Sequence, residues 1–181
     1  QQVDFYKNKI KNADNRVFVI ISDALRYEVA ADLAEQLRRE TKSQVDLSSM
    51  QSIFPTITKF GMAALLPHEQ LSVELRGNQI EVLADGQMTE SDDRDKVLKS
   101  GREDSIAIKY TDLVIAKRQD RSAWVKSRNV VYIYHDAIDE ASHTSDELVF
   151  SACDDAIAEL KNAVRIIVND FGGTNIIITA D

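Results

Sequence analysis

Acidic side chains stand at the ends of three apolar segments of the sequence. Asp23 follows RVFVIIS, Asp136 follows NVVYIYH, and Asp181 closes TNIIITA. Each segment is a short, continuous run rich in Val and Ile, which is typical of a parallel strand buried on both faces. Because parallel strands end at one edge of a sheet, where open α/β sheets bind ligands, we expect these carboxylates to converge. Converging carboxylates repel one another, so they favour a bound metal ion.

A second set of metal-ligating residue types lies just beyond Asp136. Asp139 and His143 have a D-x-x-x-H spacing, which can bring a carboxylate oxygen and an imidazole nitrogen to one ion. The other interpretation is a solvated loop leading into a helix cap, and both stay open. Asp23 likewise has a simpler interpretation, as the N-cap of the helix that follows it. We expect His135 to be a hydrogen-bonded histidine at the end of its strand.

Two threonines in the segment FPTITKF are candidate nucleophiles. A turn and a short helix are expected over 55–67, with Thr56 and Thr58 near the helix start. Free backbone N–H groups there favour a phosphate or an alkoxide. Threonine is a poor nucleophile without a base or metal, so taken alone these residues are expected to be helix caps. A metal held by Asp23 and Asp181 beside Thr58 would favour the nucleophile instead.

The elements that must position these residues alternate between strands and helices. Leu25, Val29, Leu33 and Leu37 repeat along one face of the first long helix. A Thr144–Glu147 capping box predicts the start of the last helix, and the pair at 172–173, Gly-Gly, predicts its end. Alternation implies a mostly parallel sheet covered on both sides, a three-layer α/β/α sandwich. Strands are expected at 16–23, 44–50, 129–136 and 174–181, and helices at 24–40, 110–128 and 144–171.

Two regions are expected to lie outside this alternation. Residues 1–15 predict a short helix that leads into the domain. Residues 68–105 predict an insertion in which LSVEL and QIEVL form a β-hairpin around Gly77. The remainder of the insertion is expected to be exposed, with a helix around Lys96.

Composition excludes several classes of protein. The chain has 181 residues, 44% hydrophobic and 29% charged, as expected for one soluble globular domain. No apolar run reaches the roughly 18 residues of a membrane span, and the polar start is unlike a signal peptide. The single cysteine, Cys153, cannot form an internal disulfide, so a cytoplasmic location is expected. Its place on an apolar helix face predicts a core residue rather than a nucleophile.

Charge bears on nucleic-acid binding. A formal net charge of −8 disfavours a general grip on nucleic acid, because phosphate backbones need a basic surface. The segment 117–128 is locally basic, and it either contacts nucleic acid or a partner protein or forms a solvated helix face. Its bases are Lys117, Arg118, Arg121, Lys126 and Arg128. Neither the Asp-x-Asp of a haloacid-dehalogenase-type phosphatase nor a dinucleotide-binding Gly-x-Gly-x-x-Gly is present.

The segments DALR, FPTITKFGMAALLP, VYIYHDAIDEASH and IIITAD together resemble the PglZ domain of the alkaline phosphatase superfamily. The resemblance runs from about Arg16 to Asp181, and GMAALLP and YIYHDAID are its most specific parts. It implies one PglZ domain over 1–181, truncated at both ends, in a bacterial phage-defence protein of the BREX or phage growth limitation type. Other defence-system proteins are the implied partners, and no membrane is involved.

The resemblance also implies two metal ions and a hydroxyl nucleophile at the carboxyl edge of the sheet. Asp23 and Asp181 would ligate the ion beside the nucleophile, Thr58, and Asp139 and His143 would ligate the second. Thr56 is the other candidate nucleophile. Zinc suits this ligand set, although manganese and magnesium also fit by ligand type. The implied reaction is hydrolysis of a phosphate monoester or diester, whose substrate could be a nucleotide or a nucleic acid.

One departure from the superfamily pattern concerns its histidine ligands. The His expected directly after Asp181 is absent, as is a later His ligand. Fewer than the usual zinc ligands remain, so this fragment is expected to bind metal weakly and to turn over substrate poorly. The alternative function is a catalytically silent scaffold that engages partners of the defence complex through its surface.

Overall fold

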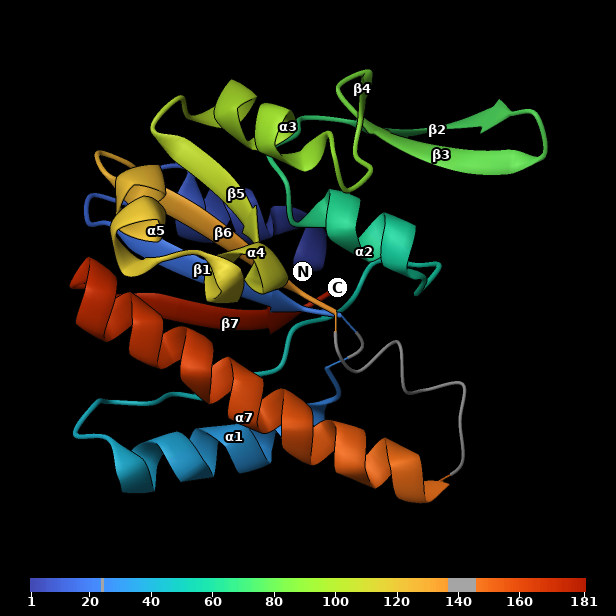
Figure 1. Cartoon of the computed structure of the whole chain (residues 1–181). Coiled ribbons are helices and arrows are strands. Elements are labelled where there is room, and N and C mark those ends of the chain that lie inside the picture. The colour runs from blue at the N-terminus through green and yellow to red at the C-terminus, as the bar shows by residue number, and fades with distance from the viewer. Residues whose placement is uncertain (24, 137–145) are drawn as a thin grey trace.

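Four parallel strands form the central sheet (Figure 1). The structure is a computed structural model, and it describes residues 1–23, 25–136 and 146–181. The strands lie in the order β5-β6-β1-β7, and each neighbouring pair is parallel. All residues of β1 are buried, as its continuous apolar sequence predicts for a strand covered on both faces. The strands are β1 (Val17–Ser22), β5 (Ser105–Lys109), β6 (Val130–His135) and β7 (Ile176–Ala180).

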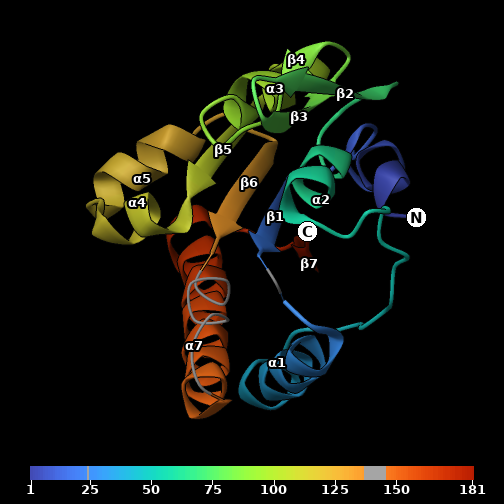
Figure 2. The same cartoon turned by 90° about the vertical axis from the view of Figure 1, so that its right-hand side faces the viewer.

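Helices cover both faces of this sheet (Figures 1 and 2). Because side chains alternate along a strand, Phe18 and Ile20 pack into the core on one face, and Val19 and Ile21 pack into the core on the other. The first face carries α1 (Tyr27–Glu40), α4 (Tyr110–Ile115), α5 (Arg118–Val125) and α7 (Asp146–Phe171). The second carries the 3-10 helix η1 (Gln2–Asp4), the π-helix η2 (Tyr6–Ile10), α2 (Thr58–Ala64) and α3 (Arg94–Gly101). The predicted three-layer α/β/α sandwich is confirmed.

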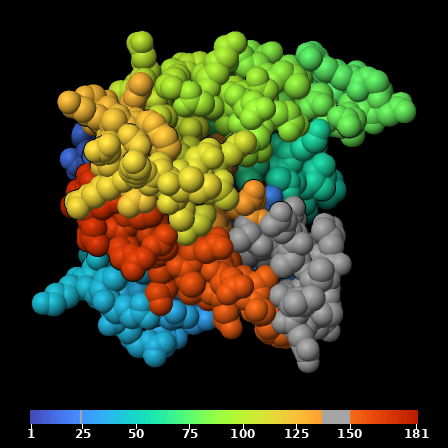
Figure 3. Space-filling view, in the orientation of Figure 1, coloured from blue at the N-terminus to red at the C-terminus, as the bar shows by residue number. Residues whose placement is uncertain are grey.

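A small antiparallel sheet projects from this body (Figure 3). It consists of β2 (Leu71–Arg76), β3 (Gln79–Ala84) and the short strand β4 (Gln87–Met88). Arg76 pairs with Gln79, so two residues make the turn, and Gly77 has a φ of 62°. Glycine reaches this left-handed conformation without steric cost, which explains why the hairpin turns there. The predicted hairpin is confirmed.

Three sequence-based expectations about secondary structure are wrong or incomplete. Residues 44–50 form no strand in the described chain, and residues 43–47 line a cavity of about 560 Å³ together with residues of β7. The insertion expected over 68–105 runs directly into the unpredicted strand β5. The single helix expected over 110–128 is two helices, since Ala116 and Lys117 both have extended backbone, with ψ values of 147° and 150°.

The N-terminal segment of the chain is packed into the domain. The expected helix over 1–15 is present as η1 and η2, and Phe5, Tyr6 and Ile10 are buried in the core. They are therefore part of the core rather than a lead-in.

Helix α7 ends as predicted: Gly172 has a φ of 63°, and the Gly173 N–H donates to the Ile167 carbonyl at 2.9 Å.

Other expectations concern helix α7 and membrane insertion. Cys153 is half-buried on α7, so the expectation of a core cysteine holds only in part. Thr144 of the expected capping box lies outside the described residues. Among the described helices, none is both long and apolar enough to cross a membrane.

Candidate functional site

Asp23 and Asp181 stand at the carboxyl ends of neighbouring strands. The register of β1 against β7 pairs Ser22 with Ala180, and each acid is the next residue of its chain. Asp23 is 8% exposed, and its N–H donates to the His135 carbonyl at 2.8 Å. Helix α1 begins only at Tyr27, with Arg26 as its N-cap. The interpretation of Asp23 as a helix N-cap is therefore wrong.

Thr58 is in hydrogen-bond contact with Asp23. Its Oγ1 donates to Asp23 Oδ1 at 3.4 Å. Thr58 is the first residue of α2 and Ile57 is the N-cap, so neither Thr58 nor Thr56 caps the helix as first expected. One turn later, a Cβ at Gly61 would lie 2.4 Å from the Asp181 carbonyl carbon. Glycine at this position lets the backbone of α2 lie directly against Asp181.

These residues line one cavity of about 710 Å³, which we call the strand-end cavity. Asp23, Thr58 and Asp181 all line it, and so does Thr56. The sequence-based expectation that these segments meet at the carboxyl edge is thus met for the two acids and both threonines. Asp136 is exposed and is not among the lining residues. Asp139 and His143 lie outside the described residues, so their role stays a prediction.

Sequence reasoning missed residues that build this cavity. Gln2 is 2% exposed, its Nε2 donates to the Ala180 carbonyl at 3.3 Å, and its Oε1 accepts the Ile53 N–H at 2.9 Å. These two hydrogen bonds connect the end of β7 to the segment before α2. Nothing in the sequence around Gln2 indicated this, because its partners lie far away along the chain. Arg26 and Ser52 also line the cavity. Arg26 could have been noticed, since it belongs to the DALR segment.

Two cationic side chains near Thr58 have different surroundings. Lys59 faces the small antiparallel sheet, where its Nζ donates to the Ile80 carbonyl at 3.0 Å and lies 3.1 Å from Glu90 Oε1. The hydrogen bond between the Lys59 and Glu90 side chains raises the pKa of Lys59 and lowers the pKa of Glu90. The positive charge of Lys59 is therefore paired with carboxylates outside the cavity. Arg26 is the one basic side chain among the described residues that line the cavity.

A buried hydrogen-bonded chain supports the strand ends beneath the cavity. Ser22 Oγ lies 2.9 Å from His135 Nδ1, and His135 Nε2 lies 2.6 Å from Glu159 Oε2 on α7. The ring of Tyr110 packs edge-on against His135 at 5.2 Å between centroids. The expectation of a hydrogen-bonded strand-end histidine is confirmed. Because both ring nitrogens have partners, His135 joins the ends of β1 and β6 to α7 rather than offering a metal ligand.

The donor atoms of the cavity suit a divalent cation only in part. Carboxylate and hydroxyl oxygens are ligands that magnesium, manganese and zinc accept. A catalytic zinc ion usually has three protein ligands, and within the described residues no group of three His, Cys, Asp or Glu side chains could hold an ion. The described residues of the cavity therefore do not form a complete metal site by themselves.

The basic segment 117–128 uses several of its charges internally. Arg118 Nε and Arg121 Nη2 lie 3.2 and 2.5 Å from the Asp170 carboxylate of α7. Arg128 Nη1 donates to the Glu103 carbonyl at 3.0 Å. These contacts hold α5 against the sandwich. They favour the interpretation of a structural, solvated helix face over that of a nucleic-acid grip.

The sandwich, with two acids and a hydroxyl gathered at the carboxyl ends of its parallel strands, has the architecture of an alkaline phosphatase-like α/β domain, the class that the family comparison assigns. The family model described as "BREX system PglZ alkaline phosphatase-like domain" matches residues 5–181. The chain therefore belongs to the PglZ family.

Two curated relatives support this assignment. The chain is 43% identical over 169 residues to the alkaline phosphatase-like protein BrxZ of Escherichia coli O9:H4 (strain HS), covering 92% of the chain and 19% of the relative. It is 37% identical over 185 aligned positions to the alkaline phosphatase-like protein PglZ of Bacillus cereus (strain H3081.97), covering 99% of the chain and 21% of the relative. The chain thus spans about a fifth of the length of these relatives.

Proposed function

We propose that this chain carries part of the active site of a metal-dependent phosphatase or phosphodiesterase, with Thr58 as the nucleophile. The observation that carries the proposal is the strand-end cavity, where Asp23, Thr58 and Asp181 come together from three separate segments. Membership of an alkaline phosphatase-like family supports the same reaction class.

The contact between Thr58 and Asp23 suits a nucleophile. Asp23 Oδ1 accepts the hydrogen bond of the hydroxyl, which directs the remaining lone pairs of Oγ1 elsewhere and fixes the rotamer. Attack of Oγ1 on phosphorus forms a phosphothreonine and breaks the ester P–O bond; the hydroxyl proton of Thr58 passes to solvent, and the leaving oxygen takes up a proton from solvent. Water then hydrolyses the phosphothreonine, releasing phosphate and restoring the hydroxyl. Divalent ions held by the carboxylates of the cavity would supply positive charge to stabilise the developing charge on Oγ1 and on the leaving oxygen.

The proposed ligands divide between two ions. Asp23 and Asp181 would hold the ion beside Thr58, and Asp139 and His143 would hold the second. Zinc suits this mixture of carboxylate and imidazole, and manganese or magnesium fit the carboxylates. The exposed guanidinium of Arg26 would pair with oxygens of the phosphate group. The substrate is a phosphate ester, a class that includes nucleotides and nucleic acids.

Hydrolysis of p-nitrophenyl phosphate and bis(p-nitrophenyl) phosphate by the full-length protein, with zinc or manganese added, tests the proposal. We expect Thr58→Ala to lower kcat/KM by about a thousandfold or more, because the nucleophile is lost. Thr56→Ala is the matched control and should change the rate by less than about tenfold. Activity that survives both Thr58→Ala and Asp23→Ala would contradict the proposal, and activity lost only in Thr56→Ala would move the nucleophile to Thr56.

The second candidate function is a scaffold within a BREX defence complex, in which surface contacts matter and catalysis is absent. The family description supports it, because it names a BREX defence system and an alkaline phosphatase-like domain but no reaction. Other proteins of the defence system would be the partners. No hydrolysis of either substrate with either metal, by a folded full-length protein, would favour the scaffold.

A further inference from the structure

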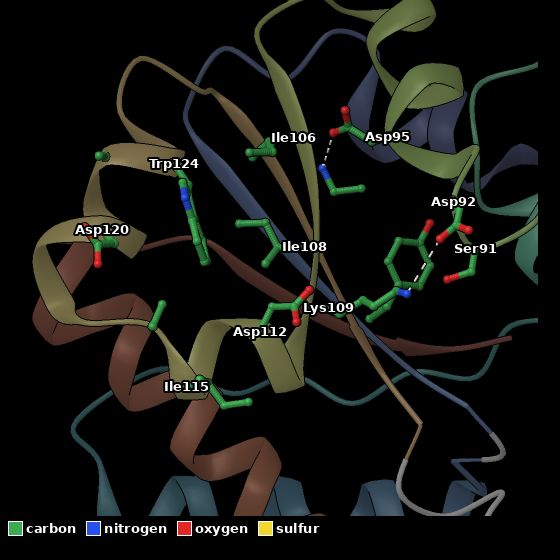
Figure 4. A pocket seen from close by; sticks show the side chains of 14 residues that line it. Ser91, Asp92, Asp95, Ile106, Ile108, Lys109, Asp112, Ile115, Asp120 and Trp124 are labelled. Atoms are coloured by element: carbon green, nitrogen blue, oxygen red, sulfur yellow. Dashed lines mark hydrogen bonds and ion pairs between the residues drawn. The ribbon is translucent and has the colours of Figure 1, made fainter.

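A groove beside the edge strand β5 has no part in the proposed reaction (Figure 4). It has a volume of about 930 Å³, and we call it the β5 groove. Strand β5 forms its floor, α4 and α5 form one wall, and the turn before α3 together with α3 forms the other. The residues that characterise it are Asp92, Ile108, Asp112, Ile115, Asp120 and Trp124.

The apolar part of the groove is unusually exposed for a folded domain. Ile115 is 83% exposed and Trp124 is 38% exposed, while Ile108 beneath them is 7% exposed. An exposed tryptophan beside exposed aliphatic side chains is typical of protein-binding surfaces, where tryptophan often carries much of the binding energy. These side chains favour an occupant with apolar groups.

The rim of the groove is acidic. Asp92, Asp95, Asp112 and Asp120 all line it. Two of these acids are paired, since Lys109 lies 3.7 Å from Asp92 and Lys99 lies 2.6 Å from Asp95. In the part of the chain that the structure describes, no ion pair involves Asp112 or Asp120. The arginines of α5 do not neutralise the rim, because Arg118 and Arg121 pair with Asp170 on the other side of that helix. This charge favours a basic occupant and repels nucleic-acid phosphates.

The edge of β5 is protected against strand addition. The Ala107 N–H, which points away from β6, donates to Asp95 Oδ1 at 2.9 Å. A carboxylate on an outward N–H removes a donor that an added strand would need. An occupant must therefore bind chiefly through its side chains.

We propose that the β5 groove binds a basic, apolar segment of a partner protein, with an arginine stacked on Trp124 and paired with Asp120. Asp120 and Trp124 are four residues apart on α5, so their side chains lie on the same helix face. A guanidinium can stack on an indole and donate to a carboxylate at the same time. Apolar side chains of the segment contact Ile108 and Ile115.

The experiment uses the fluorescence of Trp124, the one tryptophan of the sequence. The probe is a short, capped peptide of Arg, Leu and Ala, titrated into the folded chain, with a second peptide in which Glu replaces every Arg. We expect a saturable change in Trp124 emission with the arginine peptide and none with the glutamate peptide. The double variant Asp112→Asn/Asp120→Asn should weaken binding about tenfold, since two charge contacts are lost.

The matched control is Asp154→Asn/Asp155→Asn, which removes the same charge from exposed positions of α7. It should change the affinity by less than about twofold, because these acids line no part of the groove. Trp124→Ala should abolish binding of the arginine peptide, as measured by isothermal titration calorimetry because this variant lacks the fluorescent residue. Equal weakening by the two double variants, or equal binding of the glutamate peptide, or no saturable change, would overturn the proposal.

Discussion

The strand-end cavity and the β5 groove are built in opposite ways. The cavity collects polar residues from distant segments, which meet because β1 and β7 end at one edge and α2 packs across them. The groove is built mainly from residues 91–124, with Tyr134 added from β6, and it combines an apolar floor with an acidic rim. Residues with catalytic side chains at strand ends can therefore be identified individually in the sequence. A binding surface cannot, because it depends on which side chains the fold leaves exposed to solvent.

The largest expected effect separates the two regions. Asp23→Ala should lower phosphate-ester hydrolysis by the full-length protein about a thousandfold, because the proposed metal ligand and the hydrogen-bond partner of Thr58 are lost together. The same substitution should leave the affinity for the arginine peptide within about twofold, since the groove lies on other elements. Asp112→Asn/Asp120→Asn should show the reverse pattern. If either variant impairs both assays to the same extent, the two regions are not independent.

An intermediate effect concerns the scaffold of the cavity. His135→Ala should lower the free energy of unfolding by about 2–3 kcal/mol, because it leaves Ser22 without its partner and opens a void between β6 and α7. Urea unfolding at neutral pH measures this. His68→Ala is the control: His68 is half-buried, with one ring contact to the Leu66 carbonyl at 2.7 Å, and should cost less than about 1 kcal/mol. Equal costs would show that the chain through Ser22, His135 and Glu159 adds no stability.

The smallest expected effect lies at the start of β5, the strand beneath the groove. Hydrogen bonds from Arg102, at 2.8 and 3.0 Å, lower the pKa of Asp104 below its ordinary value of 3.8. The folded protein therefore holds this proton less tightly than the unfolded chain, so the pair stabilises the fold above that pH and loses its effect as the pH falls through the lowered pKa. The contribution should be below about 1 kcal/mol, because Asp104 is partly exposed.

Asp104→Asn should therefore reduce the difference between the urea midpoints measured near neutral pH and at acidic pH. Arg102→Gln should reduce it in the same direction, since it removes the partner of the same carboxylate. If Asp104→Asn leaves the difference between the two urea midpoints unchanged, other titratable groups determine the loss of stability at acidic pH.

The centre of the sheet could be predicted because nearly all residues of β1 and β6 are buried, whereas β7 is half-buried. Continuous runs such as RVFVIIS and NVVYIYH leave little alternative to a parallel strand, and the acids that follow them are then placed at one edge. Strand β5 escaped prediction because SIAIK is short and sits among charged residues. The segment 44–50 was predicted as a strand on its composition, but a strand needs a neighbour within hydrogen-bonding distance, and no described strand pairs with this segment.

The sequence by itself determined the sandwich and the hairpin at Gly77, because local patterns of burial and residue type carry that information. The candidate roles of Asp23, Thr58 and Asp181 came from its resemblance to the PglZ domain. The tertiary structure alone decided that Gln2 fastens the end of β7, that Gly61 lies against Asp181 and that Trp124 faces an acidic groove. These facts depend on contacts between segments far apart along the chain or on surfaces left uncovered by packing. Neither is encoded in the spacing of neighbouring residues.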